Sequence, residues 1–191
     1  MINLKKIFLA VVLLTFLTAC GSSEQSTNDE KSSNNVSYPN DAKVEADDFV
    51  YRLYTEKDVY GEFEETAIFA ELTYIGDQES IEISHAASPF EFPIEELSRG
   101  IKVDYAMNEP LIRTVLIKDE PLREKYHFAG GYSDQDNKQT IEFIQTIIKK
   151  GFPEGNYLMN STVNFFIENT DENVDPEQHK LNLNIGFNVK K

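Results

Sequence analysis

The residues best suited to chemistry are acidic side chains near the C-terminal end of the chain. Asp171, Asn173 and Asp175 occupy alternate positions. Carboxylate and amide oxygens at this spacing begin a calcium loop of the EF-hand type. However, Pro176 stands where that loop requires glycine, and Asn182 stands where it requires a bidentate glutamate. The stretch is therefore not an EF-hand.

Two interpretations of the surrounding loop, residues 168–180, stay open. One is a looser oxygen-ligand site for Ca²⁺ or another divalent cation, formed by the same three side chains. The other is a solvated polar loop without a ligand. Asp134 and Asp136 suggest metal binding as well, but a place in the first turn of a predicted helix already accounts for them.

Catalytic chemistry has little support in the sequence. His85, His127 and His179 are the three histidines, and they lie far apart without the spacing that places metal ligands on one helix face. Nucleophilic catalysis lacks a Gly-x-Ser-x-Gly elbow, and Ser84 beside His85 in a strand would point to the opposite face. We expect neither an enzyme nor a bound cofactor.

The N-terminal segment predicts export. Lys5 and Lys6 precede an apolar run of about thirteen residues that ends before Cys20. A transmembrane helix needs roughly 20 apolar residues, so the run is short for a span but suits the apolar part of a signal peptide. Residues 1–19 are therefore predicted to be a signal peptide.

The end of that segment, Leu17-Thr18-Ala19-Cys20, resembles the lipobox of bacterial lipoproteins. The resemblance implies cleavage before Cys20 and a diacylglyceryl thioether on its sulfur. It also implies an extracytoplasmic protein that is held on the membrane by lipid. Residues 20–43 are polar and rich in Ser and Asn, which predicts a disordered tether and favours a Gram-positive cell surface.

The net charge limits the class of partner, and the cysteine content limits covalent cross-links within the chain. The formal net charge of −15 makes nucleic acid a poor partner, because phosphates repel such a chain. Cys20 is the single cysteine, so the chain forms no internal disulfide. The folded part must therefore be held by its apolar core.

Alternating apolar residues predict one β-rich domain over residues 44–191. Residues 68–74 alternate most strictly, and residues 81–83 follow a short turn, so the two segments are predicted to pair as a hairpin. Residues 111–117 are apolar on both faces apart from two positions, which suggests a central strand. Helical periodicity over about 134–150 predicts one inserted helix.

The C-terminal part predicts a second hairpin, from a strand ending at Ile167 and a strictly alternating strand over 181–189. About eight short strands with regularly spaced turns are typical of an antiparallel β-sandwich. The stretch Pro153 to Tyr157 resembles the lead-in to the penultimate strand of immunoglobulin-like domains. There the Tyr157 hydroxyl would bond to backbone a few residues upstream as a tyrosine corner. The alternative is a simple turn before a core tyrosine.

The order of these features resembles the bacterial intracellular proteinase inhibitor domain, which is an immunoglobulin-like sandwich. The matching pieces are short and scattered over residues 66–167. The resemblance implies the sandwich fold and suggests a proteinase as one partner. No functional residue is carried over.

We therefore expect a lipid-anchored extracytoplasmic module that binds a protein or another envelope component without catalysis. A divalent-cation-dependent binding module that uses loop 168–180 is one alternative. An exported proteinase inhibitor is another.

Overall fold

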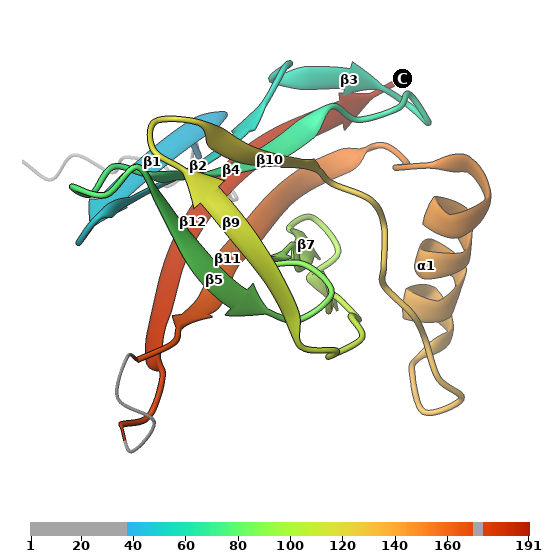
Figure 1. The fold of residues 1–191 in the computed structure, drawn as a ribbon. Coiled ribbons are helices and arrows are strands. Elements are labelled where there is room, and N and C mark those ends of the chain that lie inside the picture. Colours follow the sequence, from blue (N-terminus) through green and yellow to red (C-terminus); the bar gives the residue numbers. More distant parts are fainter. Residues whose placement is uncertain (1–37, 170–173) are drawn as a thin grey trace, which may run out of the picture. The chain divides into compact units, whose positions relative to one another are not determined.

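The computed structural model describes residues 38–169 and 174–191, which form two β-sheets and one helix (Figure 1). The smaller sheet has the order β1-β2-β4-β10. Its strands are β1 (Asp41–Ala46), β2 (Phe49–Thr55), β4 (Ile68–Tyr74) and β10 (Pro121–Lys125).

The larger sheet has the order β3-β12-β11-β5-β9, and the short strands β6, β7 and β8 extend it beside β11. Its strands are β3 (Val59–Gly61), β5 (Ser80–His85), β6 (Phe90–Glu91), β7 (Ile94–Glu96), β8 (Ile101–Val103), β9 (Ile112–Ile117), β11 (Gly155–Ile167) and β12 (Glu177–Lys190). The predicted sandwich with one helix is confirmed. One pair, β3 with β12, is parallel, whereas the other strand pairs are antiparallel.

The core lies between the inner faces of the two sheets. Strands β2 and β4 bury every second side chain, as their alternating sequences require. Tyr51 of β2 crosses the core, and its hydroxyl donates to Ser161 Oγ of β11 at 2.6 Å. Ser161 in turn donates to the Glu91 carbonyl at 2.7 Å. These two successive hydrogen bonds give both buried hydroxyls a partner and connect the sheets.

The helix is shorter than predicted. It spans Lys138–Lys150 (α1), and the Asn137 side chain accepts the N–H of Thr140 as the N-cap. Asp134 and Asp136 consequently lie before the helix, and Asp136 accepts hydrogen bonds from Ser133 instead. The predicted helix is present, but it begins after Asn137 rather than near Asp134.

The hairpin predicted from residues 68–74 and 81–83 is wrong. β4 belongs to the smaller sheet, whereas β5 crosses to the larger sheet and pairs with β9. The turn between them therefore connects two layers. The same turn residues serve either connection, so sequence alone does not separate the two arrangements.

The central strand predicted over residues 111–117 is also wrong, because β9 ends the order of the larger sheet. Leu116 is buried, whereas Ile112, Val115 and Ile117 are exposed. The apolar residues on the second face of β9 therefore meet solvent.

The C-terminal hairpin is present. β11 and β12 pair from Gly155 opposite Val189 to Ile167 opposite Glu177. Because β12 already begins at Glu177, the connecting loop is shorter than the predicted 168–180. At the other end, β1 begins at Asp41, so regular structure starts three residues before the predicted boundary at 44. None of the helices among the described residues is long and apolar enough to cross a membrane.

Burial of tyrosine hydroxyls predicts a loss of stability in alkali. Burial raises the pKa of Tyr51 and of Tyr126 well above the ordinary value of 10.0. Above pH 10 the unfolded chain binds fewer protons at these residues than the folded chain, so the free energy of unfolding falls as pH rises. We expect a slope of roughly 1.4 kcal/mol per pH unit for each such tyrosine.

Urea denaturation between pH 8 and pH 11 measures this slope. Tyr51→Phe should make the slope shallower, whereas Tyr132→Phe, at an exposed residue, should leave it unchanged. Equal slopes in the three proteins would show that buried tyrosines do not cause the loss of stability in alkali.

Candidate binding site

A hollow forms where the chain leaves the edge of β11. Ser84 pairs opposite Phe166, and the Pro89 carbonyl accepts the N–H of Asn164 at 2.8 Å. Between these two contacts β11 advances by two residues, from Phe166 to Asn164. Residues 85–88 therefore bulge out of the pairing with β11. Pro89 has no N–H to donate, so it cannot extend regular pairing. The bulge leaves the outer face of β11 uncovered at this point.

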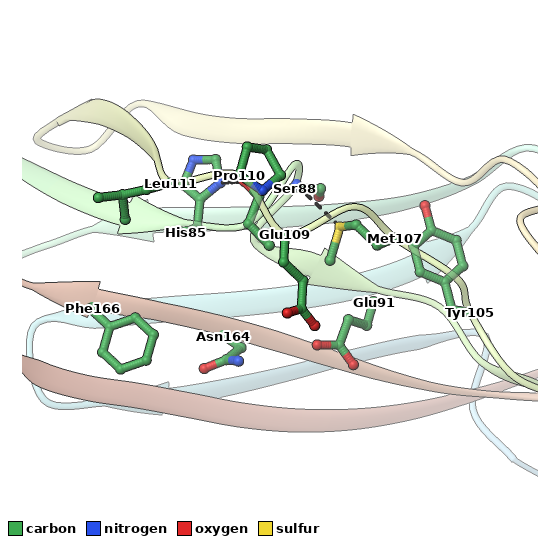
Figure 2. A pocket seen from close by; sticks show the side chains of 11 residues that line it. His85, Ser88, Glu91, Tyr105, Met107, Glu109, Pro110, Leu111, Asn164 and Phe166 are labelled. Atoms are coloured by element: carbon green, nitrogen blue, oxygen red, sulfur yellow. Dashed lines mark hydrogen bonds between the residues drawn. The ribbon is translucent and has the colours of Figure 1, made fainter.

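We call this hollow the bulge groove; it has a volume of about 400 Å³. Asn164 and Phe166 of β11 form its floor, and residues 105–111 form the opposite wall (Figure 2). Two contacts hold that wall to the bulge. The N–H of Ala87 donates to the Asn108 carbonyl at 3.1 Å, and the N–H of Ser88 donates to the sulfur of Met107 at 3.2 Å.

Apolar and polar residues contribute about equally to the walls of the bulge groove. Met107, Pro110 and Leu111 line one side, and the ring of Phe166 lies on the other (Figure 2). Tyr105 closes one end. Burial, together with the nearby charge of Glu124, raises the pKa of Tyr105 to about 12, so its hydroxyl stays neutral at physiological pH.

Two carboxylates, those of Glu91 and Glu109, point into the bulge groove (Figure 2). Within residues 38–169 and 174–191, neither has a Lys, Arg or His side chain within 4.0 Å. A third carboxylate, Glu124, accepts a hydrogen bond from Ser88 Oγ at 2.8 Å behind the wall. The groove therefore combines apolar side chains with uncompensated negative charge.

His85 borders the bulge groove but is already engaged. Its Nδ1 lies 2.8 Å from the Ala86 carbonyl, and its Nε2 lies 2.8 Å from Thr114 Oγ1. Because a carbonyl oxygen can only accept, Nδ1 carries a hydrogen. Both ring nitrogens are therefore occupied, and His85 ties β5 to β9 without a nitrogen free for a ligand.

An apolar surface continues from the bulge groove along β9. We call it the β9 patch. Its members are Leu111 (72% exposed), Val115 (55%) and Ile117 (45%), which occupy alternate positions and therefore lie on one face, whereas Ile112 (38%) lies on the opposite face with Leu116. Leu111 belongs to both the patch and the groove. β9 is the last strand of its sheet, so the backbone groups on its outer edge have no strand partner among the described residues.

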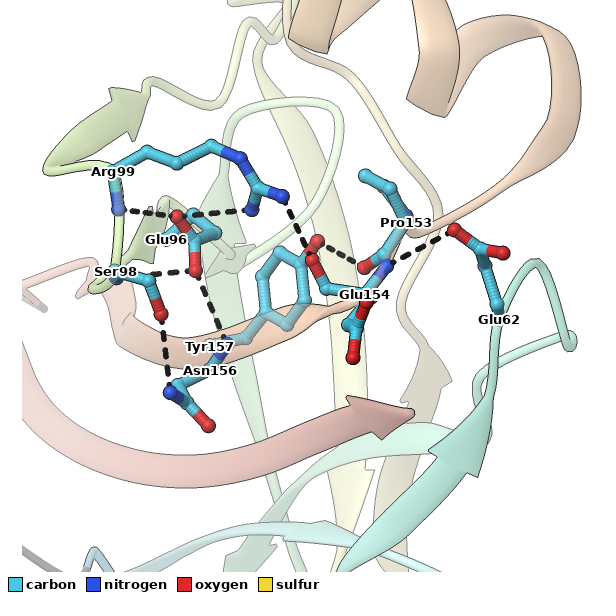
Figure 3. A network of polar contacts seen from close by, with 8 residues as sticks. All are labelled: Glu62, Glu96, Ser98, Arg99, Pro153, Glu154, Asn156 and Tyr157. Carbon is cyan, nitrogen blue, oxygen red and sulfur yellow. Dashed lines mark hydrogen bonds and ion pairs between the residues drawn. The ribbon is translucent and has the colours of Figure 1, made fainter. Parts of the chain in front are cut away.

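The hydrogen bond predicted for Tyr157 is present. Its hydroxyl donates to the Pro153 carbonyl at 2.6 Å, four residues upstream (Figure 3). The ring stacks on Phe187 with centroids 5.1 Å apart. Tyr157 is thus a structural residue at the start of β11, and its role is to hold the turn after α1.

Sequence reasoning missed a buried carboxylate beside this turn. Glu96 of β7 is fully buried and accepts the N–H groups of Ser98, Arg99 and Asn156 at 2.6–3.1 Å (Figure 3). The guanidinium of Arg99 lies 3.2 Å from the same carboxylate and also donates to the Glu154 carbonyl. The only signal in the sequence is that Glu96 shares the inward face of β7 with Ile94.

Several predicted residues fall outside these clusters. Cys20, Asp171 and Asn173 lie outside the described residues, so the structure places neither the lipidation site nor two of the three predicted metal ligands. The carbonyl of Asp175 accepts a hydrogen bond from the Asn169 side chain at 3.3 Å. In the described ranges, no three His, Cys, Asp or Glu side chains are grouped to hold a metal ion.

The remaining two histidines also lie apart from each other. His127 contacts the Tyr105 hydroxyl through Nε2 at 3.1 Å. His179 is buried, and its ring stacks on Phe165 with centroids 5.1 Å apart. The three histidines therefore belong to three separate environments.

No protein-family model matches this chain, and neither a curated protein nor a solved structure matches it. The features of this chain that bear on its function are therefore the bulge groove, the β9 patch and the N-terminal sequence.

Tyr157→Phe tests the tyrosine corner. The substitution keeps the ring but leaves the Pro153 carbonyl without its partner, so we expect a loss of about 1–2 kcal/mol in the free energy of unfolding. Urea denaturation measures it. Tyr132→Phe is the matched control, because Tyr132 is exposed, and it should change the free energy by less than about 0.5 kcal/mol.

Glu96→Gln tests the buried network. A glutamine amide has one accepting oxygen instead of two and cannot balance the Arg99 charge. We therefore expect the free energy of unfolding to fall by roughly 2–4 kcal/mol. Glu95→Gln is the control, because Glu95 is a partly exposed neighbour 3.6 Å from Lys102 and should cost under about 1 kcal/mol. Similar melting temperatures for the two variants would contradict a structural role for Glu96.

Proposed function

We propose that this chain is a lipid-anchored extracytoplasmic module that binds a protein partner through the β9 patch, without catalysis. The observation that carries the proposal is that three exposed, large apolar side chains, Leu111, Val115 and Ile117, share one face within residues 111–117. Exposed apolar side chains that share one face mark interaction sites more often than single scattered ones do.

β9 carries little of the protection that is usual for a terminal strand: Ile112–Ile117 contains neither lysine nor proline, although Pro110 and Lys118 flank it. Such strands are usually blunted by lysine, proline or an inward charge. β9 has one charged residue, Arg113, whose guanidinium lies 3.9 Å from Glu82 and 3.8 Å from Glu168. An incoming extended segment can therefore pair with the backbone of β9 and cover the apolar side chains beside it.

The N-terminal sequence supports the location of this binding. The lipobox-like Leu17-Thr18-Ala19-Cys20 predicts a lipid on Cys20, which would hold the chain at the outer face of the membrane. The strongly acidic chain disfavours nucleic acid as the partner. A protein of the cell envelope is the partner class consistent with both features.

Site-specific photo-crosslinking on intact cells tests the proposal. A photoreactive residue at position 115 should yield one discrete product, whereas one at position 148 should not. Ile148 is the matched control because it is an exposed apolar residue (56%) on α1, outside the β9 patch.

Competition makes the result specific. An excess of the unlabelled wild-type protein should suppress the product from position 115, whereas an excess of Val115→Asp should not. Ile148→Asp should compete like the wild type. Identical products from the two positions, or equal competition by Val115→Asp, would contradict binding at the β9 patch.

A further inference from the structure

We infer that the bulge groove receives a basic side chain, arginine or lysine, from an extended segment of the partner bound at the β9 patch. The inference rests on the proposed function and adds the chemistry of the partner. Its structural basis is the juxtaposition of uncompensated carboxylates, apolar side chains and a shared rim at Leu111.

The carboxylates determine the charge of the occupant. Glu91 and Glu109 both line the groove, and no cationic side chain of the described ranges lies within 4.0 Å of either. Glu124 adds negative charge behind Ser88. Like charges brought together without a counter-charge are unfavourable, and a cation between them relieves this cost. A guanidinium can also bond a carboxylate in a bidentate manner.

The walls favour an organic cation over a metal ion. Calcium takes six to eight oxygen ligands, whereas the side chains of Met107, Leu111 and Phe166 among the lining residues offer none. The stem of an arginine or lysine side chain is apolar and can pack along such walls while its charged end meets the carboxylates. The rings of Tyr105 and Phe166 supply aromatic faces that attract a cation.

The open shape favours a side chain of a protein over a free small molecule. Sites for small molecules enclose about 70–90% of the ligand surface. Here Glu109 is exposed and Leu111 is 72% exposed, so an occupant stays uncovered unless a larger partner closes over it. A segment paired with β9 would provide that cover, because Leu111 directly precedes β9 and lines the groove.

Selection from a random octapeptide library tests the inference on the full-length protein in detergent micelles. Peptides selected by the wild type should contain arginine or lysine at one fixed position. The same selection with Glu91→Gln/Glu109→Gln should lose that preference. Glu95→Gln is the matched control, because Glu95 lies on β7 outside the groove, and it should retain the preference.

The affinity of one selected peptide then measures the charge directly. Replacing its basic residue with citrulline, or with norleucine if that residue is lysine, removes the charge while keeping the length. We expect at least a tenfold weaker Kd with the wild-type protein and less than a twofold change with Glu91→Gln/Glu109→Gln. Melting curves of this double variant should match the wild type, which separates loss of the site from loss of the fold.

The remaining outcomes separate the two proposals. Selected peptides without a basic preference, whose binding is lost in Val115→Asp, would overturn the groove inference but keep the proposed function. Butylguanidinium that binds as tightly as the peptide would overturn the assignment to a protein side chain. Selected peptides whose binding is unaffected by Val115→Asp, or a selection that yields none, would overturn both.

Discussion

The pairing of β11 is the constraint on which the rest of the structure depends. On one edge β11 pairs with β12 along its whole length, from Gly155 to Ile167. On its other edge it meets β5, β6 and β7 in succession, each over one to three residues. The chain therefore has to leave and rejoin this edge repeatedly. The bulge at residues 85–88 is one such departure, and the bulge groove is the space that it creates.

The same constraint explains why the interior contains ordered polar groups. Where β7 meets the beginning of β11, the next turn leaves several N–H groups directed inward. Glu96 satisfies three of them and is balanced by Arg99. The hydroxyl of Tyr157 satisfies a carbonyl on the neighbouring side. Each polar group is buried because a strand ends beside it, and each is paired because unpaired burial is costly.

Much of the fold could be predicted from local periodicity. β2, β4 and the C-terminal hairpin follow from alternating apolar residues, and α1 follows from its apolar face and C-terminal lysines. Partners of strands were less predictable, because the turn after Tyr74 does not reveal whether the next strand stays in the sheet or crosses over. The prediction of a central strand over residues 111–117 was wrong for a related reason. Apolar side chains on both faces of a strand indicate a central position only if both faces are covered, and one face of β9 is exposed.

The candidate site was beyond sequence reasoning for a different reason. The bulge groove takes Glu91, Glu109 and Asn164 from three distant segments, and none of them belongs to a recognisable motif. Residues 86–88 and 105–111 have no periodic pattern, since they lie outside regular strands. Their proximity follows from the register of β11, which is a long-range property. By contrast, the lipobox-like stretch at Cys20 is contiguous and could be identified without any structure.

The position of β12 has a consequence for the order in which the strands of the larger sheet can pair. β12 is the last strand of the chain, yet it lies inside the larger sheet between β3 and β11. Residues 59–61 obtain their strand partner only when residues 188–190 arrive. A ribosome makes the chain from its N-terminus, so the larger sheet stays incomplete until residues 177–190 have been made. Folding is therefore dominated by contacts of long sequence separation, which form slowly.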